Sequence, residues 1–209
     1  EGKNMTDIKT LTDFQSDALK EVGNIGIGHA TTSLSQMVNK QVGISLPELK
    51  LIPLIKVPLL VKNEDPVIGI ILELKGDAKG FLLLLLSKPT AKFLVRLVIG
   101  EADVTKGFDE METSVLKELG NIMGGTYISA LSNFLSISIG LSPPSDVYDI
   151  SDAIINQVVC LMSPDVEDVL FLKTQFDINS EKIDGKILIF TDSNSLTKML
   201  EAINKLVGK

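Results

Sequence analysis

The chain carries an internal repeat at a spacing of 97 residues. Shifted by that amount, positions 21–47 align with positions 118–144 without a gap, and ten of the 27 aligned pairs are identical. A repeat on this scale predicts one structural unit used twice, with each copy too small to bury a core comfortably alone. Any fold proposed for the 209 residues must therefore accommodate an approximate twofold relation.

The expected starts of the longest helices recur at the same spacing. Thr12 and Gln15 fit a capping box, in which the threonine hydroxyl accepts from the Gln15 amide while the glutamine side chain reaches back. Asp109 and Glu112 occupy the same positions in the second copy. An amphipathic pattern follows each pair, which predicts one long helix in each copy.

Each copy is expected to continue with strands and to close with a further helix. The first copy predicts a long helix over 13–39, strands over 49–61, 67–74 and 80–87, and a helix over 89–99. The second predicts a long helix over 110–135, a segment of undecided type over 147–162, strands over 169–178 and 186–191, and a helix from 195. The apolar run Phe81–Leu86 has six residues, where a membrane span needs roughly 20. It indicates a strand buried on both faces.

These elements predict an α/β (α+β) fold in which two long helices pack on a shared, mainly antiparallel sheet with pseudo-twofold symmetry. We expect residues 1–11 to be an expression remnant and a flexible N-terminus, because Met5 fits a natural start. The first half is placed at 12–104 and the second at 105–209, with the polar stretch 101–107 joining them. Because the duplication supplies an internal partner, the expected state is a monomer.

Composition excludes several classes of function. The net charge is −7 and no basic cluster occurs, which argues against nucleic-acid binding. The single cysteine, Cys160, excludes an internal disulfide and fits a reducing compartment; it is predicted to be a buried thiol. The single histidine, His29, excludes a multi-histidine metal site and is predicted to be a packed or boundary residue. No targeting or membrane segment is visible, so a cytoplasmic protein is expected.

Polar residues recur on one face of the two long helices. At 100° per residue, three side chains of each helix fall within about 60° of one another: Asp17, Glu21 and Asn24 in the first, and Ser114, Glu118 and Asn121 in the second. A single Glu/Asn pair is typical of a solvated helix face. Its recurrence at one helical position favours a function, since asparagine is a poor residue for a helix interior.

The rest of each helix predicts close packing. The opposite faces are apolar: Leu19, Val22, Ile25 and Gly26 in the first helix, and Leu116, Leu119, Ile122 and Met123 in the second. Glycine costs about 1 kcal/mol relative to alanine in a helix interior. We therefore expect Gly23, Gly26 and Ala30 to let the helix approach another backbone. Pro47 and Pro144 are expected to terminate or edge the strand after each helix.

At these positions the chain resembles the CheC family of chemotaxis phosphatases (CheC/CheX/FliY). The family signature is Asp or Ser, three residues, Glu, two residues, Asn, twenty-two residues and Pro. It occurs here twice with every spacing kept: Asp17, Glu21, Asn24 and Pro47, then Ser114, Glu118, Asn121 and Pro144. Two intact copies are most similar to the CheC branch of the family.

The resemblance implies hydrolysis of the aspartyl phosphate of CheY, the response regulator that controls the flagellar motor. Asn24 and Asn121 would each orient an attacking water, and Glu21 and Glu118 would dock onto a lysine of the regulator. Mg²⁺ would belong to the regulator, so no cofactor or metal site of this chain is expected. CheD, a receptor deamidase, is a further candidate partner. The alternative is a non-catalytic adaptor for a response regulator or CheD, or a component of the flagellar switch.

Overall fold

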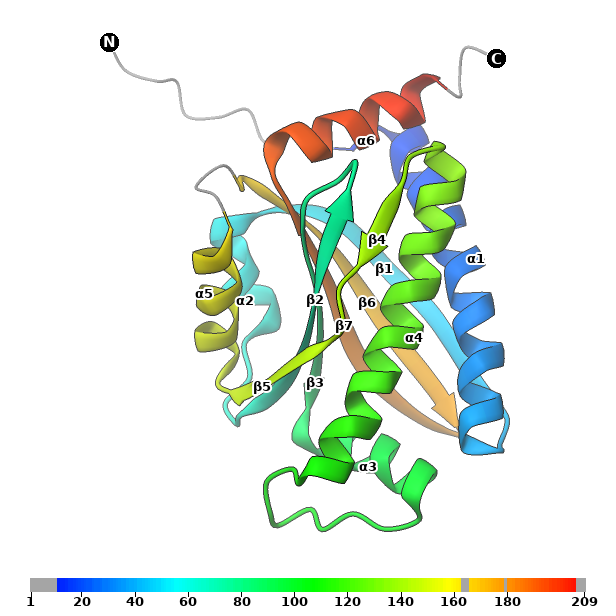
Figure 1. Cartoon of the computed structure of the whole chain (residues 1–209), viewed down its shortest axis with the longest axis vertical. Helices are drawn as coiled ribbons and strands as arrows, with labels where there is room; N and C mark the ends of the chain where they lie inside the picture. Colours follow the sequence, from blue (N-terminus) through cyan, green and yellow to red (C-terminus); the bar gives the residue numbers. More distant parts are fainter. Residues whose placement is uncertain (1–10, 163–165, 179, 206–209) are drawn as a thin grey trace.

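The computed structural model describes residues 11–162, 166–178 and 180–205 (Figure 1). The helices are α1 (Asp13–Val38), η1 (Leu54–Lys56), α2 (Val57–Val61), α3 (Lys88–Ile99), α4 (Glu110–Leu135), α5 (Ser151–Leu161) and α6 (Ser193–Lys205). The strands are β1 (Val42–Pro53), β2 (Val67–Gly76), β3 (Gly80–Ser87), β4 (Ile139–Leu141), β5 (Ser145–Asp149), β6 (Asp168–Ile178) and β7 (Glu181–Thr191). The N-terminal remnant expected at 1–11 lies, apart from Leu11, outside the described residues.

Both predicted capping boxes form, and each begins a long helix. In α1 the Gln15 amide donates to the Thr12 hydroxyl at 3.2 Å, and the Thr12 amide donates to Gln15 Oε1 at 3.0 Å. In α4 the Glu112 amide donates to Asp109 Oδ1 at 2.8 Å, and the Asp109 amide donates to Glu112 Oε2 at 3.0 Å. These bonds satisfy amides that a helix start otherwise leaves without a partner. Both helices end within a residue of their predicted ends.

The ends of the two long helices are also built alike. Asn39 and Ser136 cap them with φ angles of 50° and 54°, the left-handed conformation that ends many helices. Four residues before each cap, a serine bonds the strand that follows. Ser35 Oγ accepts from the first amide of β1 at 3.0 Å, and Ser132 Oγ accepts from the first amide of β4 at 3.3 Å. The identity of these two serines in the repeat thus has a structural cause.

The described strands form one sheet in the order β1-β6-β7-β3-β2-β4, with β5 following β4 along β2. Every pairing is antiparallel. The order reads the same from both ends if β1 is matched with β4 and β5, β2 with β6, and β3 with β7. The first strand of each copy therefore pairs with a strand of the other copy. The predicted pseudo-twofold arrangement on a shared antiparallel sheet is confirmed.

Helices cover both faces of this sheet (Figure 1). Alternate side chains of a strand point to opposite faces. Ile68 and Ile70 of β2 belong to an apolar cluster with α1, α3, α4 and α6, whereas Val67 and Ile71 belong to a second cluster with α2 and α5. Because both faces are covered, the central strand β3 is apolar along its length, and Leu82–Leu86 are all buried. The prediction of a doubly buried strand is confirmed.

Three predicted elements differ from the structure, and one of them is the strand expected over 186–191, which is β7 and begins five residues earlier at Glu181. The strand expected over 49–61 is instead β1, which begins at Val42 and ends at Pro53, followed by η1 and α2. Pro58 stands in the first turn of α2, where its missing amide costs no hydrogen bond. A short apolar run cannot be assigned to helix or strand by its pattern alone. The undecided segment 147–162 divides into β5 and α5.

Three side chains that we expected to pack lie at the surface. Ile25 is 45% exposed, because its neighbour Gly26 is the residue that faces α4. His29 is exposed on a flank of α1 that no described element covers. Cys160 is exposed rather than buried. In α5, Val158 points into the core, and Cys160 lies two residues, about 200°, further round the helix.

The long helices α1 and α4 lie side by side and antiparallel (Figure 1), and a glycine brings their backbones together. A Cβ on Gly26 would stand 2.8 Å from Tyr127 Cα and 3.1 Å from the Thr126 carbonyl oxygen of α4. The expectation that Gly26 permits close approach to another backbone is confirmed. Gly23 differs, because the space that its Cβ would take is filled by the Leu46 side chain of β1.

Gly26→Ala should destabilise the protein although alanine is the better helix former. The new methyl group would overlap backbone atoms of α4, so the helices must separate, and we expect the free energy of unfolding to fall by about 1–3 kcal/mol. Gly28→Ala is the matched control. Gly28 is exposed and a Cβ there meets no atom within 4 Å, so this variant should gain about 0.5–1 kcal/mol. Urea denaturation measures both; equal gains would contradict the close helix contact.

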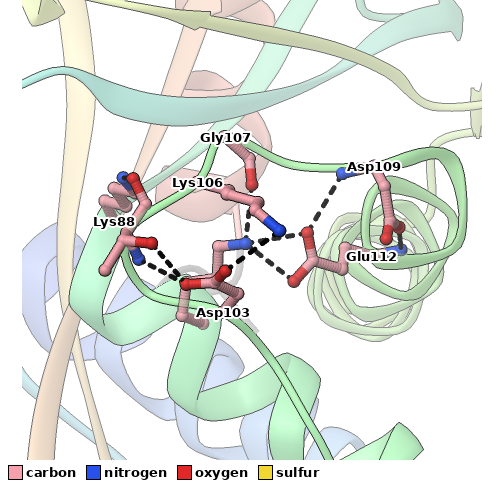
Figure 2. A network of polar contacts seen from close by, with 8 residues as sticks. Lys88, Asp103, Lys106, Gly107, Asp109 and Glu112 are labelled. Carbon is pink, nitrogen blue, oxygen red and sulfur yellow. Dashed lines mark hydrogen bonds and ion pairs between the residues drawn. The ribbon is translucent and has the colours of Figure 1, made fainter.

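A buried ion pair connects α3 to the start of α4. Lys92 Nζ lies 2.7 and 2.8 Å from the two carboxylate oxygens of Glu112 and 2.6 Å from the Gly107 carbonyl oxygen. The two side chains are only 1% and 6% exposed. The ring of Phe108 lies 4.8 Å from Nζ. Figure 2 shows Gly107, Asp109 and Glu112 meeting at this point. All three hydrogens of the ammonium group therefore have acceptors.

The equivalent position in the first copy is Gln15, which is also buried. Its side-chain amide donates to Asn204 Oδ1 of α6 at 3.1 Å. The third residue of each long helix thus closes its own capping box and also contacts a shorter helix that ends a copy. One contact is charged and the other neutral.

The loop between α3 and α4 has polar contacts of its own (Figure 2). Asp103 accepts from the Thr105 hydroxyl at 2.6 Å and from its amide at 2.9 Å, and Lys106 Nζ lies 3.4 Å from the carboxylate. The bond from the Thr105 hydroxyl is the largest cause that lowers the pKa of Asp103 to about 2. The carboxylate is therefore ionised at mildly acidic as well as neutral pH.

Candidate functional site

The predicted polar residues lie on the outer faces of α1 and α4. All six side chains are exposed: Asp17, Glu21, Asn24, Ser114, Glu118 and Asn121. We call the first three the α1 stripe and the last three the α4 stripe. The residues between them in sequence pack inward, as Val22 and Leu119 do. Within each stripe the Glu and Asn are three residues apart, which places their Cβ atoms about 5–6 Å from one another.

The glutamates and asparagines of the stripes have no competing partners among the residues that the structure describes. Within the described ranges, no ion pair involves Glu21 or Glu118, and no side-chain hydrogen bond involves Asn24 or Asn121. Their carboxylate and amide groups face solvent. A polar group that is already hydrated loses little when it exchanges water for a partner of matching chemistry.

The two stripes differ in charge. In the α1 stripe, Asp17 adds a second carboxylate, and Lys20 Nζ lies 3.9 Å from it. In the α4 stripe the equivalent of Asp17 is the neutral Ser114, and the equivalent lysine, Lys117, is drawn to Asp146 at 2.7 Å. The two stripes are therefore alike in their Glu/Asn pair and unlike in the electrostatic field around it.

Pro47 and Pro144 interrupt the two edge strands at equivalent points. Pro47 lies where the register of β1 against β6 shifts, between Ser45 and Glu48. Pro144 lies in the break between β4 and β5. A proline cannot donate a ladder hydrogen bond and occurs in sheets at edges and bulges. Pro144 thus follows the end of β4, as expected, whereas Pro47 lies inside β1 at the register shift rather than at an end of the strand.

The stripe residues are exposed and line neither the cavity at the α3–α4 loop nor the one beneath α6. A cavity of about 650 Å³ is lined by Lys92, Glu112 and residues of the α3–α4 loop. An apolar cavity lies beneath α6. Small-molecule sites are concave and bury most of their ligand. The geometry of the stripes suits a partner that brings its own pocket, as a folded protein does.

Within 11–162, 166–178 and 180–205, no three His, Cys, Asp or Glu side chains gather in a group that could hold a metal ion. None of the helices in those ranges combines the length and the apolar character that a bilayer crossing requires.

Sequence reasoning missed two exposed apolar side chains near the stripes. Phe14 is 43% exposed and Met111 is 62% exposed, at equivalent positions in the first turn of α1 and α4. Applying the 97-residue shift to apolar residues on the polar face would have found them. The sequence also did not distinguish Gly28 and Gly125 from Gly26. A Cβ at Gly28 or Gly125 would meet no atom within 4 Å, whereas a Cβ at Gly26 would meet the backbone of α4.

Comparison with known proteins agrees with the repeat. A model of the CheC-like family matches residues 14–51 and 111–148. The chain is 29% identical over 199 residues to the CheY-P phosphatase CheC of Bacillus subtilis, which covers 92% of this chain and 95% of that protein. It is 28% identical over 188 residues to the flagellar motor switch phosphatase FliY of Bacillus subtilis, which covers 87% of this chain but 47% of FliY.

Solved structures share the architecture. The crystal structure of Thermotoga maritima FliY superposes with a TM-score of 0.77 at 25% identity, over 93% of this chain and 98% of that one. The FliM middle domain from H. pylori gives a TM-score of 0.69 at 11% identity, over 92% of this chain and 99% of that one, which shows a common fold only. The segments matched by the family model contain both stripes and both prolines, 97 residues apart. In both of its copies the chain is therefore similar to the CheC-like family.

Proposed function

We propose that this protein is a phosphatase that hydrolyses the aspartyl phosphate of a CheY-type response regulator, at the two stripes. The observation that carries the proposal is a contrast among the repeated residues. Ser35 and Gly23 recur because a strand or a neighbouring side chain needs them there. Glu21 and Asn24 recur, as Glu118 and Asn121, yet they are exposed and no described residue bonds their side chains. Their recurrence favours a role toward a partner.

The asparagine suits the chemistry of an acyl phosphate. The aspartate is already a good leaving group, so hydrolysis needs a water placed in line with the P–O bond that breaks. In this proposal the amide oxygen of Asn24 or Asn121 accepts a hydrogen bond from the water and orients it, as a glutamine does in GTPases. The water oxygen attacks phosphorus, the bond to aspartate breaks, and the proton leaves with the inorganic phosphate. No strong base is required.

The glutamate supplies docking. Glu21 and Glu118 lie one helical turn before the asparagine on the same face. A lysine of the regulator that pairs with this carboxylate would bring the phosphoryl group to the amide one turn away. An exposed ion pair contributes about 0–1 kcal/mol on its own, so its main effect is orientation. Magnesium, in this proposal, is held by the regulator. The monomeric state and a complex with CheD stay separate predictions.

Phosphate release is the direct test. The regulator is phosphorylated, separated from its phosphodonor and mixed with a tenth of its amount of this protein, and inorganic phosphate is followed with time. We expect many turnovers per protein molecule. If the regulator binds but loses phosphate at its own rate, the non-catalytic adaptor becomes the better description.

A further inference from the structure

Gly28 and Gly125 are repeated glycines for which the fold gives no reason. A Cβ on either would meet no atom within 4 Å. Neither has a positive φ angle, so neither needs the conformational freedom of glycine. Glycine is nonetheless less favourable than alanine in a helix interior. Packing therefore explains Gly26 but leaves the recurrence of these two glycines without a structural cause.

Their place on the helix is the same in both copies. Gly28 follows Asn24 by four residues, and Gly125 follows Asn121 by four. Residues four apart are neighbours on one helix face. Because side chains of a helix lean toward its N-terminus, a side chain at position 28 would cover the turn that carries Asn24. The missing side chain leaves the asparagine open from that direction.

We propose that Gly28 and Gly125 are clearance positions, by which we mean positions where the absence of a side chain leaves space for the regulator. The phosphorylated aspartate and the loops around it can then contact the helix beside the asparagine. This inference rests on the proposed function. The attacking water donates to the amide oxygen of the asparagine and lies about 3 Å from both that oxygen and the phosphorus atom. Only one water molecule therefore separates the asparagine from the phosphoryl group. The regulator must therefore contact the helix surface closely at this turn, and a bulky residue would hold it away.

A local obstruction can be told from a folding defect because the chain has two sites. Gly28→Leu is made in two backgrounds: Asn121→Ala, which leaves only the α1 stripe with its asparagine, and Asn24→Ala, which leaves only the α4 stripe. Leucine is a good helix former and the position is open, so the melting temperature should stay equal or rise in both. Phosphate release from the phosphorylated regulator should fall about tenfold or more in the first background and stay unchanged in the second.

The matched control is Gln36→Leu, an exposed position two turns further along α1. It should leave kcat/KM unchanged in both backgrounds. Equal turnover with glycine and leucine at position 28, in a protein that hydrolyses the phosphate, would overturn the clearance role. A similar loss in both backgrounds would point to a general defect and overturn it as well. Absence of turnover in the unmodified protein would instead remove the proposed function itself.

Discussion

Replacing Asn24 and Asn121 together by alanine should abolish the accelerated loss of phosphate from the phosphorylated regulator. We expect the catalysed rate to fall about a hundredfold or more, because a water that is not oriented loses much of the benefit of proximity. Both side chains are exposed and make no hydrogen bond within the described ranges, so the melting temperature should stay near that of the unmodified protein. Release of inorganic phosphate at substoichiometric protein measures the effect.

The matched control is Gln36→Ala combined with Asn133→Ala. These residues are exposed, lie on the same two helices and are also 97 positions apart. We expect full turnover in this variant. The single asparagine variants then give the rate of each stripe, and the charge difference between Asp17 and Ser114 leads us to expect unequal rates. A double asparagine variant that hydrolyses at the normal rate would remove the asparagines from the mechanism.

Lys92→Met should have the largest effect on stability. It leaves the Glu112 carboxylate, which is 6% exposed, without its ammonium partner. Breaking a buried pair in this way typically costs about 3–5 kcal/mol, a large part of the 5–15 kcal/mol that stabilises an ordinary domain. The stripes are not altered, so activity per folded molecule should be retained. Chemical denaturation followed by circular dichroism measures the loss.

The first copy supplies the design of the control. Gln15 shows that a neutral amide at this helix position can be buried and still close a capping box. Lys92→Met combined with Glu112→Gln should therefore be clearly more stable than Lys92→Met alone, because no charge is left unpaired. The comparison also needs Glu112→Gln alone. If the losses in free energy of unfolding for Lys92→Met and Glu112→Gln added up to the loss for the double variant, the coupling energy between the two side chains would be zero, and the argument from the buried contact would be wrong.

The parts of the fold that could be predicted are those with local signals. The capping boxes at Thr12 and Asp109 located both long helices, because a cap is a contact between residues three apart. The strand expected over 49–61 was wrong because its true start lies close behind the helix, and its apolar continuation turns into η1 and α2. The Lys92–Glu112 pair joins residues 20 apart in the sequence, and no sequence pattern in α3 or α4 predicts this contact.

The candidate site was predictable in its residues but less so in its surroundings. The repeat located Glu21 and Asn24 and their counterparts, and the structure exposes all four. Which neighbours are exposed depends on how α1 packs against α4, and at Gly26 there is no room for a Cβ between the two helices. A helical wheel contains no such contact. It therefore placed Ile25 on the buried face, although its side chain is 45% exposed.

The exchange of edge strands between the two copies has a consequence for synthesis on the ribosome. Val42 of β1 pairs with Ile178 of β6, 136 residues later in the chain, and Pro53 pairs with Asp168. Contacts of such long range form slowly, since the intervening chain must first be closed into a loop. Until β6 has emerged, β1 presents an unpaired edge, which is the feature of sheet proteins most open to association with other chains. We therefore expect the nascent first copy to keep this open edge until the second copy has been synthesised.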